Sequence, residues 1–224
     1  YSFWGLLAIP MASFLGALLT VFVVYSLARV GHTIPTTNLI LAGVAFSSFA
    51  TSLTSFLMLR STGEVRRALG WLLGGVSQSG WTAILAILPY LLIGLGILLF
   101  SGHALNLLQF GDEQAQQLGL DVTRTKTVLL VASSLAAAAA VAFSGIIGFI
   151  GLVVPHIVRL WNGPDHRQLV PLSILVGAAA LLASDVLARV LLAPQEIPVG
   201  IITALAGAPF FLWVLRRSKN QGYW

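Results

Sequence analysis

Long apolar stretches separated by short polar ones run through most of the chain. Residues 5–28, 38–59 and 81–100 are each mostly apolar, and each has the roughly twenty residues that a helix needs to cross a bilayer. Two further stretches of this kind, 169–192 and 198–215, lie in the C-terminal part. The pattern predicts an all-α, polytopic transmembrane helix bundle that forms a single domain over the whole chain.

One apolar stretch, residues 127–154, is longer than a single span needs. Lys and Arg do not decide between a simple span and a broken one, because each model satisfies the positive-inside bias in one orientation. The excess length and the glycine spacing favour a broken helix. We expect a helix to about Phe143, a turn in SGIIGFIG, and a short return helix to Leu160. The residues assigned to this break are Gly145, Gly148, Gly151 and Pro155.

The segment around residues 64–76 is also apolar in part, but it is too short to span. Arg66 and Arg67 lead into the run ALGWLLGGV. Such a short apolar piece is typical of a re-entrant or interfacial helix. The two arginines could be the solvated end of this helix or part of an outward docking surface for a partner.

The second span, 38–59, is unusually rich in hydroxyl side chains. These residues can bond to their own helix or to a neighbouring one, or they can line a wet cavity. The residues are Ser47, Ser48, Thr51, Ser52, Thr54 and Ser55.

A short polar segment, GDEQAQQLG at residues 111–119, interrupts two long apolar stretches. Asp112 can cap a helix, Glu113 suits its positive N-terminal end, and Gly119 suits the left-handed residue that ends it. The predicted helix has about two turns and is too short to cross a membrane. It is either a plain amphipathic loop helix or a partner-binding helix at the end of the bundle, within residues 111–120.

Composition narrows the function classes. Only 8% of residues are charged, 58% are apolar and the mean hydropathy is +0.94, whereas a soluble domain carries about 25% charge. The net charge of +5 comes from basic residues scattered singly in loops, which is not a nucleic-acid footprint. The chain has no cysteine, no P-loop and no His pair at metal-ligand spacing. We therefore expect no catalytic residues, no bound metal or cofactor, and no ATP hydrolysis by this chain alone.

Asp185 and Arg189 stand four residues apart on one helical face near the end of a span. They could form an intrahelical ion pair, or Arg189 could face outward with Glu196 and dock an acidic partner. An intramembrane acid can also relay protons, so a proton-coupled secondary transporter that uses Asp185 is the alternative function. A relay generally needs a second acid at depth, and the sequence offers none.

Three runs carry a resemblance to a known family. They are GDEQAQQLGLDVTRTK, SGIIGFIGLVVPHIVRLWNGPDHRQLVPLS and SDVLARVLLAPQEIPVGIITALAGAPFFLWVLRR. Together with LAGVAFSS and WLLGG they resemble the permease subunits of bacterial ABC importers for iron–siderophore complexes, haem and vitamin B12. The resemblance covers essentially the whole chain.

This resemblance implies a fold, a set of partners and a location. The chain resembles the last seven helices of a ten-helix permease, and the first three helices lie outside it. Such permeases sit in the bacterial cytoplasmic (inner) membrane as homodimers. Two ATP-binding subunits hold ATP and Mg inside, and a periplasmic or lipid-anchored binding protein docks outside. The implied function is import of a metal chelate by alternating access, and the sequence does not identify which chelate.

The resemblance also implies roles for particular residues. The loop 112–119 matches the family's cytoplasmic coupling helix, and Arg189 matches a position that pairs with acidic residues of the binding protein. The implied ATPase-coupling residues are Asp112, Glu113, Gln114, Ala115, Gln117, Leu118 and Gly119. The candidate docking residues are Arg189, Glu196, Arg66 and Arg67.

Overall fold

The computed structural model describes residues 3–31, 34–60, 65–75 and 80–219. These residues form ten helices and no sheet, which confirms the predicted all-α class. The helices are α1 Phe3–Ala28, α2 Thr36–Arg60, α3 Val65–Leu72, α4 Trp81–Phe100, α5 Gly102–Leu108, α6 Asp112–Gln117, α7 Val122–Ser144, α8 Ile150–Asn162, α9 His166–Val190 and α10 Val199–Lys219.

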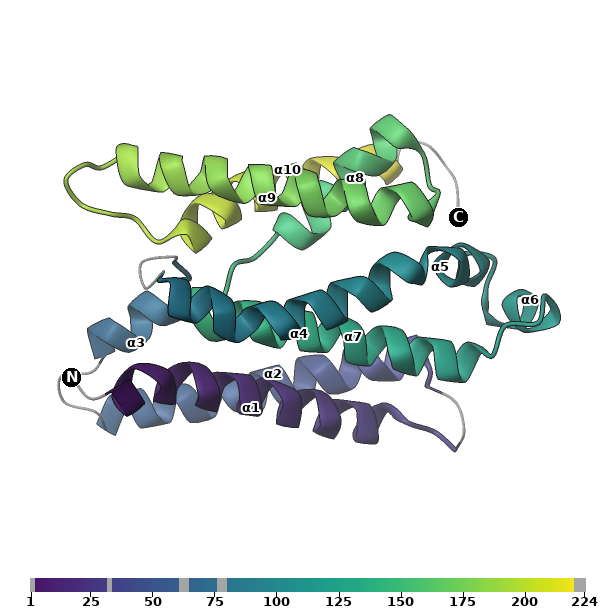
Figure 1. Ribbon diagram of the computed structural model, residues 1–224, viewed down its shortest axis with the longest axis horizontal. Coiled ribbons are helices and arrows are strands. Elements are labelled where there is room, and N and C mark those ends of the chain that lie inside the picture. Colours follow the sequence, from purple (N-terminus) through teal and green to yellow (C-terminus); the bar gives the residue numbers. More distant parts are fainter. Residues whose placement is uncertain (1–2, 32–33, 61–64, 76–79, 220–224) are drawn as a thin grey trace.

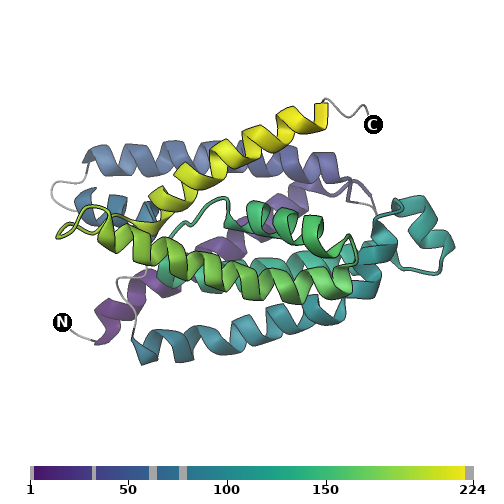
Figure 2. The same cartoon turned by 90° about the horizontal axis from the view of Figure 1, so that it is seen from above.

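The long helices pack as two groups (Figure 1). The first group consists of α1, α2, α4 and α7, in which α7 lies against both α4 and α1 and α1 lies against α2. The second group consists of α8, α9 and α10, in which α9 lies against both α8 and α10 (Figure 2). The short helices α5 and α6 project at one end of the bundle, called here the α6 end, and α3 lies at the opposite end, called the α3 end.

Small residues bring α4 and α7 together. Alanines are the buried residues of α7, and they include Ala132 and Ala136. A Cβ added at Gly94 of α4 would lie 2.8 Å from the Ala132 carbonyl oxygen and 2.9 Å from the Ala136 Cβ. Apolar surface gains little by leaving lipid, so close backbone approach through small residues is what holds such helices together.

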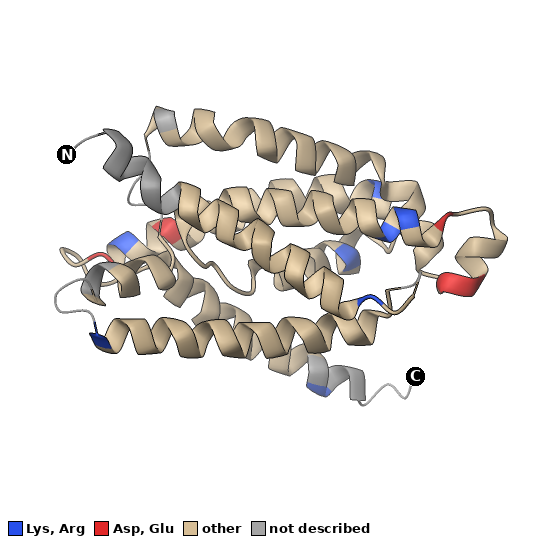
Figure 3. Cartoon of the chain, turned by 90° about the horizontal axis from the view of Figure 1, so that it is seen from below, with Lys and Arg blue, Asp and Glu red and all other residues tan. Residues whose placement is uncertain are grey.

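The outer faces of the helices are strongly apolar. Side chains such as Phe22, Leu59 and Leu175 are 68%, 87% and 68% exposed. Charged residues of the described part lie toward the two ends of the bundle and leave the middle of the long helices uncharged (Figure 3). This distribution suits a molecule surrounded by hydrocarbon along its length.

Five helices in the described residues are long and apolar enough to cross a membrane: Met11–Ala28 of α1, all of α2, Ala83–Phe100 of α4, all of α7 and all of α9. The predicted spans 5–28, 38–59, 81–100 and 169–192 therefore correspond to helices. The predicted span 198–215 corresponds to α10, but its apolar part is shorter, Val199–Val214. At 1.5 Å per residue that part measures about 24 Å.

Candidate functional site

Two backbone hydrogen bonds end the helix α6 at its C-terminus. The N–H of Leu120 donates to the Ala115 carbonyl and the N–H of Gly119 donates to the Gln116 carbonyl, each at 3.0 Å. This is the Schellman arrangement, and it requires the left-handed conformation that Gly119 adopts with φ +88°. The glycine expected to end this helix does so.

Only one side chain of α6 is buried. Ala115 is fully buried, whereas the other residues of the helix are exposed and Leu118 just beyond it is 62% exposed. The helix contacts α5 on one side and α7 on the other. It is therefore anchored at one face, and the side chains of Glu113, Gln114 and Gln117 are accessible.

Asp112 does not cap α6, contrary to the prediction. The N-cap position belongs to Gly111, with φ 93° and no side-chain bond. The Asp112 carboxylate instead accepts a hydrogen bond from the Lys126 Nζ at 2.6 Å and ties α6 to α7. The capping aspartate is Asp121, whose carboxylate accepts from the backbone N–H of Arg124 at 3.0 Å at the start of α7.

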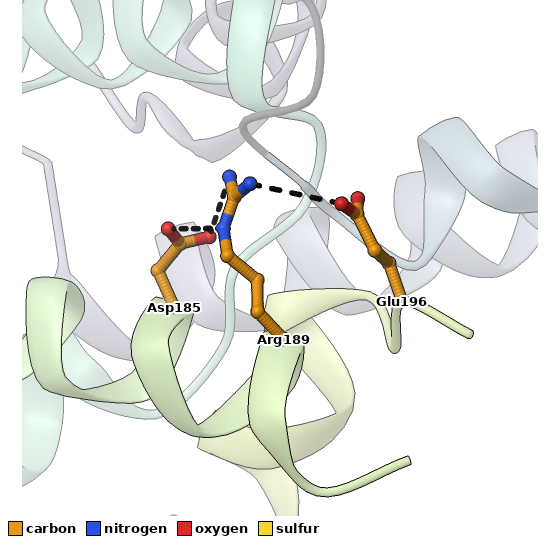
Figure 4. A network of polar contacts seen from close by, with 3 residues as sticks. All are labelled: Asp185, Arg189 and Glu196. Atoms are coloured by element: carbon orange, nitrogen blue, oxygen red, sulfur yellow. Dashed lines mark hydrogen bonds and ion pairs between the residues drawn. The ribbon is translucent and has the colours of Figure 1, made fainter. Parts of the chain in front are cut away.

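The helix α3 and the C-terminal end of α9 with the loop after it, which carry the candidate docking residues, lie at the α3 end, away from α6 (Figure 1). Arg189 Nε donates to Asp185 Oδ2 at 2.9 Å, which is the intrahelical ion pair. The same guanidinium lies 3.7 Å from Glu196 Oε1 in the loop after α9 (Figure 4). Both acids therefore neutralise Arg189, and the three side chains form one partly exposed cluster.

Arg66 and Arg67 lie on α3, an eight-residue helix, as expected for a segment too short to span. The side chains of these two arginines lie outside the described residues, so their assignment to the docking surface stays a prediction.

The long apolar stretch is broken where the glycines stand. The helix α7 ends at Ser144, Gly145 has φ 65° and Phe149 has φ 66°. The helix α8 then runs back to the α6 end (Figure 1). Gly148 lies in the break, but Gly151, which was expected there as well, lies inside α8. Pro155 was grouped with the break, and the return helix was expected to run through it, as α8 does.

Three backbone segments come into close contact at this break: the end of α3, the break itself and the start of α10. The sequence analysis did not predict this arrangement. A Cβ added at Gly145 would collide with the Trp71 carbonyl oxygen, and one at Gly74 would collide with that of Ile146. One at Gly200 would collide with the Leu73 carbonyl oxygen, and one at Gly207 with the Phe149 ring. The N–H of Gly75 donates to the Ser144 carbonyl at 2.8 Å. We call Gly74, Gly145, Gly200 and Gly207 the glycine junction.

The hydroxyls of α2 bond to their own helix. Ser48, Ser52, Thr54 and Ser55 each donate to the carbonyl four residues earlier, at 2.8–2.9 Å. None of the described residues of α2 is buried. An open cavity of about 650 Å³ lies along this helix, lined by Ile40, Gly43, Val44, Ser47, Ser48 and Thr51. The polar face of α2 is thus turned to open space and not to a neighbouring helix of this chain.

Metal binding finds no support in the described residues. Within them, no three His, Cys, Asp or Glu side chains come together in a way that could hold a metal ion.

Comparison with known proteins agrees with the sequence motifs. The pattern of the FecCD transport family matches residues 1–217. The cobalamin import system permease protein BtuC of Halobacterium salinarum is 49% identical over 94% of this chain and 56% of its own length. The hemin transport system permease protein HmuU of Yersinia pestis is 41% identical over 94% of this chain and 63% of its own length.

The fold has a solved counterpart. A structure described as the inward-facing conformation of a metal-chelate type ABC transporter superposes with a TM-score of 0.79 at 30% identity, covering 95% of this chain and 74% of that one. The chain spans less than two thirds of the length of the two curated relatives. On the family pattern, the identities and the fold, this chain belongs to the FecCD transport family and is a multi-pass, all-helical membrane protein.

Proposed function

We propose that the chain is part of the permease subunit of an ATP-driven importer in a cytoplasmic membrane. Its cargo would be a metal chelate, namely an iron–siderophore complex, haem or a cobalamin. The named relatives are permeases for cobalamin and hemin, which supports this class of cargo. The cargo crosses by alternating access and is not changed chemically.

The observation that carries the proposal is the exposed helix α6. Its side chains other than Ala115 are accessible, and it stands at one end of an otherwise apolar bundle. In the proposed importer this is the cytoplasmic end, where each of two ATP-binding subunits grips one copy of α6. ATP and Mg are held by those subunits.

The opposite end would receive a substrate-binding protein, periplasmic or lipid-anchored. Arg189, 48% exposed in its side chain, is the candidate contact. Its intramolecular partners are Asp185 and Glu196, so docking would exchange one acidic partner for another. The proton-carrier alternative depends on Asp185 alone, and this carboxylate is paired with Arg189.

A second copy of the chain would complete the transport pathway. The described side chains of α2 are all unburied, and three of its hydroxyl residues, Ser47, Ser48 and Thr51, line an open cavity. A homodimer that brings two such faces together would enclose a wide, weakly polar path. Weak contacts suit transport, because tight binding would hold the cargo within the pathway.

The test replaces exposed residues of α6. Leu118→Arg and Gln114→Arg should abolish stable binding of the ATP-binding subunits and stop uptake, because each puts a bulky charge in the contact. Both side chains are exposed, so membrane insertion should be unaffected.

The matched control is Gln195→Arg, an exposed position in the loop at the α3 end. Binding of the ATP-binding subunits should survive this change. Equal binding by the α6 variants and the unaltered chain in a co-purification assay would refute the proposed role of α6.

A further inference from the structure

A polar cluster joins α5, which directly follows α4, to the second helix group at the α6 end, and the proposed function does not yet use it. Asn106 and Gln109 lie on and just after α5, and Asp165 and His166 stand at the start of α9. We call these four residues the α5–α9 clamp. It is the main polar connection between α5 and the second helix group in the described residues.

Both ends of the Asn106 amide are used. Its Nδ2 donates to Asp165 Oδ1 at 2.6 Å, and its Oδ1 accepts from the backbone N–H of His166 at 2.8 Å. Exchanging the amide nitrogen and oxygen would set donor against donor and acceptor against acceptor. The contact therefore fixes one relative position of α5 and α9.

Gln109 adds a second connection. Its Nε2 donates to the Pro164 carbonyl at 3.0 Å and lies 2.6 Å from His166 Nδ1. A carbonyl oxygen only accepts, so this contact sets the orientation of the amide. Asn106 Oδ1 lies 3.0 Å from the same His166 Nδ1, so the tautomer of the ring decides whether this nitrogen accepts from Gln109 or donates to Asn106.

The two backbones also touch directly beside the clamp. A Cβ added at Gly102, the first residue of α5, would lie 3.0 Å from Arg167 Cα and 3.1 Å from its backbone nitrogen. Arg167 also places a guanidinium nitrogen 3.0 Å from His103 Nδ1. Because the two backbones are in contact, a shift of α5 along α9 would also displace α9.

A displacement of α9 at the clamp would be passed to the buried core of the second helix group. Leu169, one turn beyond Asp165, is buried together with Val154 and Val158 of α8. On the other side, α6 packs against α5. An unbroken series of contacts thus runs from α6 through α5 to α8 and α9.

We propose that the α5–α9 clamp is a set of positioning residues that pass the movement of α6 to the second helix group. This rests on the proposed function, in which a partner moves α6. The Asp112–Lys126 contact carries the same movement to α7. The clamp makes both groups respond together, and α8, which starts at the glycine junction, is moved from its other end.

The experiment uses the complete transporter, assembled with its ATP-binding subunits in lipid vesicles, and measures cargo transported per ATP hydrolysed. Asn106→Asp places two carboxylates against each other where 2.6 Å now separates donor and acceptor. Transport per ATP should fall about five-fold or more, in the usual range for coupling between sites. Binding of the ATP-binding subunits should persist, because α6 is unaltered.

The double variant Asn106→Asp/Asp165→Asn supplies the second measurement. It returns one amide donor and one carboxylate to the pair, so transport per ATP should recover. Asp165→Asn alone keeps an acceptor for the Asn106 amide and should be nearly neutral. Gln109→Ala, at an exposed position, should lower transport per ATP more mildly.

Full coupling in Asn106→Asp would overturn the proposal, and so would a loss that the double variant fails to restore in an intact complex. A different result separates the proposed function from this inference. If the unaltered chain never binds an ATP-binding subunit, the proposed function itself fails, and the clamp has no movement to transmit.

Discussion

At the scale of single residues, the glycines of this chain are not interchangeable. Gly145 combines φ 65° with direct contact to the Trp71 carbonyl, whereas Gly148, three residues on, has open space around its Cα and no positive φ. The sequence showed both glycines in one run, and their spacing indicated a break. Which of them is indispensable depends on α3, seventy or so residues earlier, and local pattern contains no such information.

This difference gives a paired prediction. Gly145→Ala should destabilise the protein by about 2–4 kcal/mol, because it adds backbone strain to a collision with a carbonyl that cannot rotate away. Gly148→Ala should change stability by less than about 0.5 kcal/mol. Thermal unfolding in detergent measures both, and equal effects would contradict the close approach at the glycine junction.

Asp165 gives a prediction on pH. Its pKa lies below the ordinary value of 3.8, chiefly because the Asn106 amide donates to the carboxylate and also because the Arg167 backbone N–H does. The stabilisation is complete above the ordinary value and is lost as the pH falls through the lower value in the folded protein. Asp165→Asn should therefore flatten the acid side of a plot of Tm against pH. If Asp165→Asn left the plot unchanged, the hydrogen bonds to the Asp165 carboxylate would not contribute to stability.

At the scale of elements, length and apolar pattern were enough to predict the long helices, whereas the short helix α5 was not predicted. The break between α7 and α8 followed from excess length, and α3 followed from insufficient length. Caps were harder. Asp112 and Asp121 each stand at the start of a helix, but only Asp121 caps, because the N-cap position of α6 belongs to Gly111 and Asp112 is already its first helical residue. The local pattern does not place the start of a helix to within one residue.

The corrected assignment of the cap can be measured. Asp121→Ala should cost about 1 kcal/mol of stability, the usual effect of losing an N-cap. Asp112→Ala removes only an ion pair whose carboxylate side is 60% exposed, and it should cost less than half as much. A larger loss for Asp112→Ala in a comparison of unfolding free energies would restore the original assignment.

At the scale of the whole molecule, the sequence predicted a membrane bundle with a polar helix at one end. It did not predict the two helix groups, their close contact at the glycine junction or their connection through the α5–α9 clamp. These contacts join segments that lie far apart in the sequence. At the clamp they are single hydrogen bonds, and at the glycine junction they depend on glycines that have no side chain. Composition and periodicity describe the surface a helix presents, but not the partner it meets.

The central claim is that α6 faces the cytoplasm and receives force from an ATP-binding subunit. Residues 1–224 contain no cysteine, so one introduced by Leu118→Cys is the only thiol within this part of the protein. In intact cells it should crosslink to the ATP-binding subunit and should resist a membrane-impermeant maleimide added outside. Labelling from outside, with no crosslink inside, would contradict the account.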